Sequence, residues 1–534
     1  MSARRSPLAP PRWLGWSLAI GPLVALALFF VWPLVAIGSR GLRWSAVRHV
    51  LADHGVARVA WFTLWQAAVS TAATFVVALP LTAAVSRFAF RGRRLVIALV
   101  GVPFVLPTVV VATAISATLP RSWDGTVRAI IVAHVFFNVA VVVRTVGAAW
   151  TQLDARYEDA ARTLGASRVT AARTIALPLL RGPILAASAI VFLFTFTSFG
   201  VVRLLGGPRH PTLEVEIYRR AAQQVDLPAA SALGLVQLVA VIAVLALWAR
   251  AGRRRPPASA LRNRPPATRA RRPAERSFVF LATTVTMVAL ALPIARLVER
   301  SLAVPGGHGL AWYRSLSSAG RGTTRALRPL AAFRTSLTTA FISCVIATVV
   351  GALAALALTY TRRGRGRGLL GAGLMLPLGT SAVTIGLGLF VAFGQAPLDL
   401  RGSAIMVPLA HALIGIPFVV RALAPTLQAI DPRLHDAAAT LGASRWQTFA
   451  LIDVPLARRT LIVGAGMAFA VSLGEFGATS FLTRRSTPTV PIAIANLLAR
   501  PGRGNVGQAQ ALAVLLAGVV TVVFVVTDRF AEAR

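Results

Sequence analysis

The sequence predicts an all-α polytopic membrane protein with about 12 transmembrane helices, arranged as two parallel six-helix repeats. The chain is 56% hydrophobic and only 14% charged, whereas soluble globular proteins contain about 25% charged residues. Its mean hydropathy of +0.70 is correspondingly high. Twelve apolar runs are long enough to cross a bilayer, and a segment of the first half recurs in the second. These observations together give the fold class.

Each predicted span is a predominantly apolar run of about 20 residues, the length that crosses roughly 30 Å of hydrocarbon. The runs cover residues 14–38, 61–85, 95–119, 127–150, 182–206, 229–249, 278–298, 335–360, 369–394, 403–425, 459–483 and 508–527. The first run follows three arginines and has no clear small-residue cleavage site. We therefore interpret it as a retained span rather than a signal peptide.

A segment rich in proline and arginine divides the chain near its midpoint. Residues 250–276 contain ten arginines and no apolar run, a composition that predicts a flexible cytoplasmic linker. The first half is then 1–249 and the second is 277–534, with six spans each. Arginines are more numerous in one alternating set of connecting segments. This bias favours both termini in the cytoplasm.

The two halves share a repeat. Residues 156–168 and 433–445 are identical at most positions and lie 277 residues apart. The same offset pairs His134 with His411. Because each half has an even number of spans, both halves begin on the same side of the membrane, which makes the repeats parallel. A pathway between the halves is the simplest architecture.

The basic and sulfur-containing residues exclude several functions. All 56 basic residues are arginine, and the formal net charge is +39. In a soluble protein such a charge would indicate nucleic-acid binding. This chain is too apolar to be such a protein, so we expect no nucleic-acid partner. Without lysine it contains no P-loop for ATP. One cysteine, Cys344, permits neither an internal disulfide nor a cysteine-based metal cluster. We expect no metal site and no catalytic residues.

The repeated segment predicts a helix–turn–helix elbow on the inner membrane surface. An acid and two alanines favour a short helix, a glycine ends it, a serine caps a second helix, and a proline redirects the chain toward the bilayer. The residues at these positions are Asp159, Ala160, Ala161, Gly165 and Pro178 in the first half, and Asp436, Ala437, Ala438, Gly442 and Pro455 in the second.

This elbow resembles the "EAA" loop of inner-membrane permeases in binding-protein-dependent ABC transporters. That pattern is Glu-Ala-Ala, three residues, Gly, nine residues and Ile-x-Leu-Pro. Asp159 and Asp436 replace the glutamate, and Val454 replaces the leucine in the second copy. The resemblance implies that each elbow docks in a cleft of a separate ATPase subunit, in two copies because there are two elbows.

The same resemblance implies the remaining partners and the location. An extracytoplasmic solute-binding protein would deliver cargo to the outer loops 207–228, 299–334 and 484–507. The chain would lie in the bacterial cytoplasmic (inner) membrane and need no cofactor, because ATP is used by the partner subunit.

The fused halves resemble the iron(III)/thiamine branch of these permeases. Residues 133–138 and 206–218 are more similar to thiamine permeases than to ferric ones. The resemblance thus favours thiamine or a thiamine phosphate, with ferric iron as the alternative. An ion-coupled secondary carrier would need several intramembrane acids, and an integral-membrane enzyme would need clustered polar residues at one face. The sequence favours neither.

Glu475 is the acidic residue most deeply placed in an apolar run, and its repeat partner is Ser198. A charged side chain at the bilayer centre costs about 2.5 kcal/mol or more, so it should face a cavity or a partner. A cationic solute would use that charge. The alternative is a structural pair with an arginine or with helix-end hydrogen bonds.

Two further residue pairs are candidates for the solute pathway. His134 and His411 recur in both halves, where an interhelical hydrogen bond is the simpler interpretation. Phe199 and Phe476 are able to stack on a flat cation, although aromatic residues in helix bundles mostly serve packing.

Overall fold

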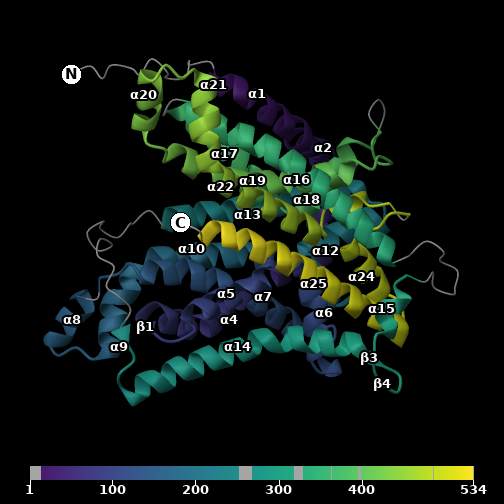
Figure 1. Cartoon of the computed structure of the whole chain (residues 1–534). Helices are drawn as coiled ribbons and strands as arrows, with labels where there is room; N and C mark the ends of the chain where they lie inside the picture. Colours follow the sequence, from purple (N-terminus) through teal and green to yellow (C-terminus); the bar gives the residue numbers. More distant parts are fainter. Residues whose placement is uncertain are drawn as a thin grey trace. The chain divides into compact units, whose positions relative to one another are not determined.

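Helices make up nearly all of the described chain in the computed structural model, which covers residues 14–154, 156–251, 268–317, 329–361, 364–394, 399–484 and 486–532 (Figure 1). The strands within these ranges form two short pairs. Strand β1 (Phe88–Ala89) runs parallel to β2 (Thr268–Arg269), and β3 (Ala303–Val304) is antiparallel to β4 (Gly307–His308). The all-α prediction is confirmed. Most of the predicted linker falls in 252–267, outside the described residues.

Contacts divide the chain into two compact units. One comprises 1–47, 220–234 and 310–534, and the other comprises 48–219 and 235–309. We call them the C-terminal unit and the N-terminal unit. Helices α3 (Trp44–Ala52) and α13 (Leu227–Ala251) cross the boundary between them.

The N-terminal unit is built around three long helices that pack on one another: α4 (His54–Arg87), α7 (Val127–Trp150) and α10 (Leu177–Phe196). Its other helices are α5 (Arg93–Val105), α6 (Thr108–Thr118), α8 (Arg156–Thr163), α9 (Arg168–Ala171), α11 (Gly200–Leu205), α12 (Leu213–Tyr218) and α14 (Pro273–Leu302).

The C-terminal unit has the same central arrangement, made by α16 (Pro329–Tyr360), α19 (Met406–Gln428) and α22 (Val454–Gly474). The rest are α1 (Leu14–Leu26), α2 (Trp32–Gly41), α15 (Ala311–Ser315), α17 (Arg365–Gly379), α18 (Ala382–Ala392), α20 (Pro432–Thr440), α21 (Arg445–Thr448), α23 (Thr479–Leu482), α24 (Val490–Leu498) and α25 (Arg503–Glu532).

Small residues let the three central helices of the C-terminal unit approach closely. A Cβ atom on Gly351 would lie only 2.7 Å from the Cβ of Val419. One on Gly415 would lie 3.2 Å from the Cβ atoms of Ala347 and Ala468. Because lipid tails are as apolar as a protein core, helices in a membrane associate largely through such close packing.

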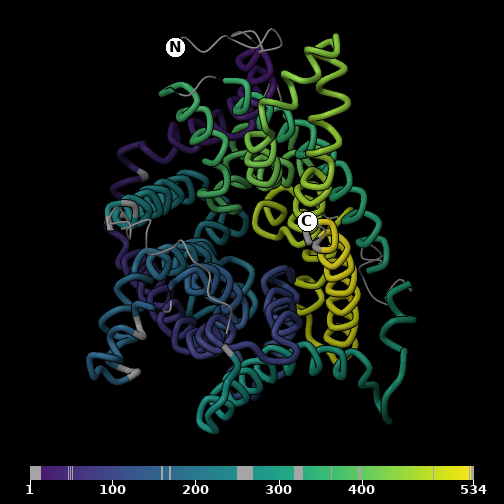
Figure 2. Tube along the Cα trace, turned by 60° about the vertical axis from the view of Figure 1, so that its left-hand side comes forward, coloured from purple at the N-terminus to yellow at the C-terminus, as the bar shows by residue number. Residues whose placement is uncertain are grey.

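The first spans of the two sequence halves pack away from their own half. Helices α1 and α2 pack on α16 and α18 in the C-terminal unit, where Figure 2 shows the purple N-terminal segment beside the green helices. Helix α14 packs on α4, α5 and α6 in the N-terminal unit. The compact units therefore follow the repeat from the second span of each half onward, except that residues 220–234, which include the start of α13, belong to the C-terminal unit.

Ten helices among the described residues are long and apolar enough to cross a membrane. Predicted spans 95–119 and 369–394 are wrong as single helices, because α5–α6 bends by 103° and α17–α18 by 97°. Pro107 cannot donate a backbone hydrogen bond at the first break. At the second, Ser381 caps α18 by accepting from the amides of Val383 and Thr384. Counting each bent pair as one span gives twelve.

Two other predicted spans end early. Helix α10 ends at Phe196 instead of continuing to 206, and α22 ends at Gly474 instead of 483. In both places a short helix, α11 or α23, follows after a break. Apolar composition continues across these breaks, which is why a count of apolar residues did not locate them.

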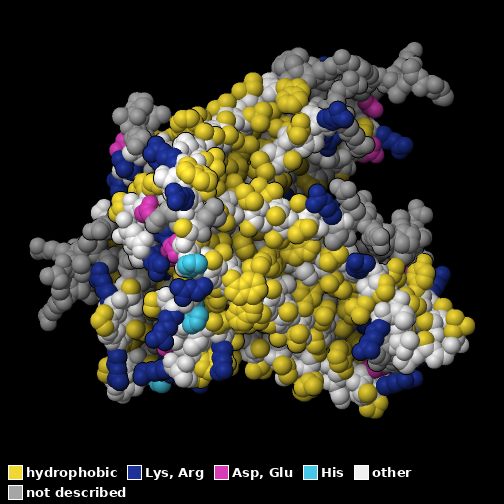
Figure 3. Space-filling view, turned by 180° about the vertical axis from the view of Figure 1, so that it is seen from behind, with side chains coloured by type: hydrophobic (Ala, Val, Ile, Leu, Met, Phe, Trp, Pro, Cys, Tyr) yellow, Lys and Arg dark blue, Asp and Glu magenta, His cyan; other side chains and the backbone are white. Residues whose placement is uncertain are grey.

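The outer faces of the long helices are apolar, as lipid contact requires. Along α14 the side chains of Phe280, Leu281, Val285 and Val288 are all more than half exposed. Hydrophobic side chains cover much of the surface seen in Figure 3, with arginines in scattered groups among them.

Candidate functional site: two elbows and two buried histidine clusters

Each elbow turns at a glycine with a left-handed backbone. Gly165 has φ of +88° and Gly442 has φ of +78°, and neither has an atom within 4 Å of where a Cβ would be. The Gly442 amide donates to the Ala439 carbonyl at 3.0 Å, and the Ala443 amide donates to the Ala438 carbonyl at 3.0 Å. This is the Schellman pattern that ends helices. The first elbow repeats it, with the Ala166 amide donating to the Ala161 carbonyl.

A serine begins the second helix of each elbow, as predicted. Ser444 Oγ accepts from the Gln447 amide, and the Gln447 side chain accepts from the Ser444 amide at 2.7 Å, which is a capping box. In the first elbow Ser167 Oγ accepts from the Thr170 amide at 3.1 Å. The serines thus satisfy amides that the first turn of a helix leaves without a partner.

The prolines do not redirect the chain, and that expectation is wrong. Pro178 and Pro455 lie in the first turn of α10 and α22, each preceded by a π-helical turn, Ala172–Ala176 or Phe449–Asp453. The chain continues as one helix from the elbow into the span. A wider π turn accommodates the proline, which has no amide and clashes with the preceding turn.

The elbows expose apolar side chains at their tips. Leu164 is 89% exposed and Leu441 is 87% exposed, each immediately before the glycine. Asp436 and Ala437 are exposed and Ala438 is half-buried. Ala160 is exposed and Ala161 half-buried in the first elbow, while the Asp159 side chain lies outside what the structure describes. An exposed leucine on a rigid turn is available to contact another protein.

A buried aspartate that was not predicted from the sequence anchors the second elbow. Asp453 is 6% exposed. Its carboxylate accepts from His435 Nε2 at 2.9 Å and from the Tyr360 hydroxyl at 3.3 Å. These bonds tie α20 and the end of α16 to the start of α22. The repeat offset places Ala176 at this position in the first elbow, so the anchor belongs to one elbow only. The signal was a lone acid beside the proline of an apolar run.

Asp453→Ala is expected to loosen the second elbow by removing the acceptor of two hydrogen bonds. Losing hydrogen bonds from two half-buried donors to a carboxylate costs about 1–3 kcal/mol. Hydrogen exchange of the α20 amides should therefore rise. Asp453→Asn keeps one acceptor oxygen and is the matched control with a smaller effect. Wild-type exchange in both variants would exclude the anchoring role.

The N-terminal unit contains a buried histidine cluster. His134 on α7 is 2% exposed. Its Nδ1 lies 3.1 Å from Ser70 Oγ on α4, and its Nε2 lies 2.9 Å from Ser198 Oγ after α10. The histidine thus joins α7 to α4 and to the break after α10, which supports the interhelical hydrogen bond over a ligand role.

The C-terminal unit repeats the cluster with an acid in it. His411 Nδ1 lies 2.8 Å from Ser472 Oγ, while Nε2 lies 2.7 Å from Thr479 Oγ1 and 3.0 Å from Glu475 Oε2. Glu475 stands where Ser198 stands in the other unit. Both His411 and Glu475 are buried. Among the described residues, the ion-pair partner of Glu475 is His411 and not an arginine.

The position of Glu475 in an apolar run indicated a place midway along a span, and this expectation is wrong. Glu475 is the C-terminal cap of α22, with an extended backbone. Its carboxylate accepts from the amides of Ala478 at 2.8 Å and Thr479 at 2.9 Å, at the start of α23. A carboxylate at a helix start satisfies unpaired amides and the helix dipole. The helix-end alternative describes this geometry.

The two candidate phenylalanines are buried among other groups. The Phe199 ring centroid lies 5.4 Å from that of Tyr218, and the Arg203 guanidinium lies 5.4 Å from the Phe199 centroid. Phe476 is 2% exposed. The cation that Phe199 contacts in this structure is therefore the guanidinium of Arg203.

Two more buried acids lie in α12, in a segment read from the sequence as an outer loop. Glu214 is fully buried, and its Oε1 accepts from Gln237 Nε2. Glu216 is 2% exposed and lies 2.8 Å from Arg219. The alternation of acids with apolar residues over 213–217 was the sequence signal for these buried acids. Across the described residues, no group of three or more histidine, cysteine or acidic side chains is placed to hold a metal ion.

The chain matches one family model twice. The model for the inner membrane component of binding-protein-dependent transport systems matches residues 76–255 and 347–533. The thiamine transport system permease protein of Brucella suis is 27% identical and aligns over 100% of this chain and 98% of its own length.

Two other relatives extend the comparison. The thiamine transport system permease protein of Escherichia coli is 26% identical over 92% of both chains. A putative 2-aminoethylphosphonate transport system permease protein of Salmonella paratyphi A is 29% identical, over 37% of this chain and 73% of its own.

Proposed function

The chain belongs to the family of inner membrane components of binding-protein-dependent transport systems, and from that premise we propose that it forms the membrane pathway for import of thiamine or a thiamine phosphate. The observation that carries the proposal is the full-length similarity to relatives named as thiamine permeases, across both repeats. Ferric iron, the alternative from the sequence, has no better support in these comparisons.

The proposal assigns ATP hydrolysis to a separate subunit, bound at each of the two elbows. The exposed Leu164 and Leu441, on turns fixed by left-handed glycines, support such docking. The second helix of each elbow continues without a break into α10 or α22, so a movement of the elbow would be transmitted to that span. A solute-binding protein would act on the opposite face. The elbows and both termini would then be cytoplasmic, and the chain would need no cofactor of its own and bind no nucleic acid.

The solute pathway is proposed to include the histidine clusters and the phenylalanines beside them. Glu475 is the charge in these clusters that suits a cationic solute. Its four hydrogen-bonding contacts mean that it would contribute an electrostatic potential rather than a vacant acceptor.

Deletion of the chain in the bacterium that makes it is expected to abolish high-affinity uptake of radiolabelled thiamine, with recovery when the chain is restored. Ferric ion and 2-aminoethylphosphonate uptake, measured in the same cells, are the controls and should not change. Loss of ferric uptake with normal thiamine uptake would replace the proposal by its alternative.

The purified chain alone is expected to hydrolyse no ATP, because a P-loop requires a lysine and the sequence has none. Phosphate release is measured with and without the partner ATPase, which serves as the positive control. Sustained hydrolysis by the isolated chain, with contaminants excluded, would refute the assignment of ATP use to another subunit.

A further inference from the structure

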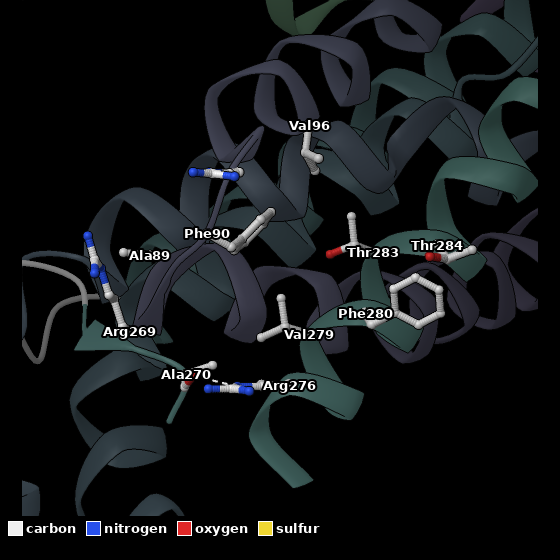
Figure 4. A pocket seen from close by; sticks show the side chains of 11 residues that line it. Ala89, Phe90, Val96, Arg269, Ala270, Arg276, Val279, Phe280, Thr283 and Thr284 are labelled. Carbon is white, nitrogen blue, oxygen red and sulfur yellow. Dashed lines mark hydrogen bonds between the residues drawn. The ribbon is translucent and has the colours of Figure 1, made fainter. Parts of the chain in front are cut away.

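A cavity of about 780 Å³ opens in the N-terminal unit (Figure 4), and none of its lining residues belongs to an elbow or a histidine cluster. It lies between the turn that joins α4 to α5 and the first turns of α14. Its lining residues are Ala89, Phe90, Arg91, Val96, Arg269, Ala270, Arg276, Val279, Phe280, Thr283 and Thr284. The volume is in the range of ordinary ligand sites.

The cavity lies where membrane-crossing helices end. Helix α4 ends at Arg87, α5 begins at Arg93 and α14 begins at Pro273, and all three belong to candidate spans. Ends of spans lie near the membrane–water interface. The pairing of β1 with β2 holds residues 268 and 269 beside 88 and 89 and so fixes one wall. The cavity is therefore at the depth of lipid headgroups.

The polar side of the cavity is strongly basic. Among the described residues, three arginines and no acid line it. Arg276 Nε donates to the Ala270 carbonyl at 3.3 Å, which holds this guanidinium at the rim beside β2, as the dashed line in Figure 4 shows. The neighbouring acid, Glu275, lies outside the lining and accepts from the amides of Arg271 and Arg272. Planar guanidinium groups match phosphate oxygens in two-point contacts.

The other side of the cavity is apolar and continuous with the lipid-facing surface. Phe90 and Val279 line its wall, and Phe280, 71% exposed, extends from it along the outside of α14. The Thr283 hydroxyl is buried there and has no hydrogen-bond partner among the described residues. Figure 4 shows the Thr283 side chain near those of Phe90 and Val279. A basic rim joined to an apolar wall fits an amphipathic anion better than a small inorganic anion.

We propose that this cavity binds an anionic phospholipid, with its phosphate held by Arg91, Arg269 and Arg276 and an acyl chain lying along Phe280. Basic pockets between spans at the membrane surface recognise such headgroups. The lipid would join β2 and the start of α14 to the α4–α5 turn. This binding would stabilise the N-terminal unit whatever solute the chain transports.

The test compares the full-length chain in phosphatidylcholine nanodiscs with and without phosphatidylglycerol. Native mass spectrometry counts retained phosphatidylglycerol, and thermal unfolding measures the stabilisation. The double variant Arg269→Gln/Arg276→Gln should bind phosphatidylglycerol about 30-fold more weakly, as expected for two basic residues near an anionic surface. The matched control Arg365→Gln/Arg367→Gln removes the same charge at the start of α17, outside the cavity, and should retain wild-type binding.

Three results would overturn the proposal. They are no preference for phosphatidylglycerol in the wild type, equal loss in both double variants, and equal stabilisation by inorganic phosphate in phosphatidylcholine alone. If the double variant unfolds during purification, Arg91→Gln, on the other wall, should lower retention about fivefold. Unchanged retention in that variant would count against the site.

Discussion

Replacing Gly442 by proline is expected to abolish ATP-driven uptake while the chain still inserts into the membrane. Proline fixes φ near −65° and has no amide, whereas Gly442 has φ of +78° and donates to the Ala439 carbonyl. The cost is about 3 kcal/mol or more, enough to lower the population of the native elbow about a hundredfold. Uptake of labelled thiamine and co-purification of the ATPase subunit are the measurements.

Gly442→Asn is the matched control, because asparagine tolerates the left-handed conformation and keeps its amide. It should retain most uptake and ATPase binding. Gly165→Pro and Gly165→Asn test the first elbow in the same way. Full ATPase binding and uptake in both proline variants would show that neither turn couples the subunits.

The elbows could be located from the sequence because their signals are local. A glycine after a short helix and a serine before the next one specify a turn through their own backbone preferences. Gly442 and Ser444 adopt the conformations expected of them. The effect of Pro455 was missed because it depends on a π turn, which relieves the clash that a regular helix would suffer.

The pathway residues were harder to place because their environment is set by distant helices. Glu475 lies in an apolar run, yet the helix ends one residue before it. Nothing local distinguishes a capping acid from one at mid-span. The bends after Val105 and Gly379 were missed for the same reason, since apolar composition continues through them. The exchange of α1 and α14 between units depends on packing that no single segment encodes.

Glu475→Gln is expected to destabilise the C-terminal unit and to lower uptake with it. The carboxylate accepts from two amides and the Thr479 hydroxyl, and it faces His411 Nε2 at 3.0 Å. A glutamine of the same shape has one acceptor oxygen, and its amide group would point at donors. Disrupting a buried, hydrogen-bonded charge of this kind costs about 3–5 kcal/mol. Thermal unfolding in nanodiscs and thiamine uptake, measured on the same preparations, check both effects.

Comparing Glu475→Gln with a variant at the equivalent position of the other unit distinguishes a structural role of Glu475 from a role in transport. Ser198→Ala removes a single neutral hydrogen bond to His134 and should cost about 1 kcal/mol, so the Glu475 variant should lose markedly more stability. A cycle of Glu475→Gln with His411→Asn should give non-additive losses, because the two side chains share one contact. If Glu475→Gln instead unfolds like the wild type while thiamine uptake falls, the charge acts on the cationic solute and the capping role is secondary. Unchanged stability together with unchanged uptake would exclude both roles for this carboxylate.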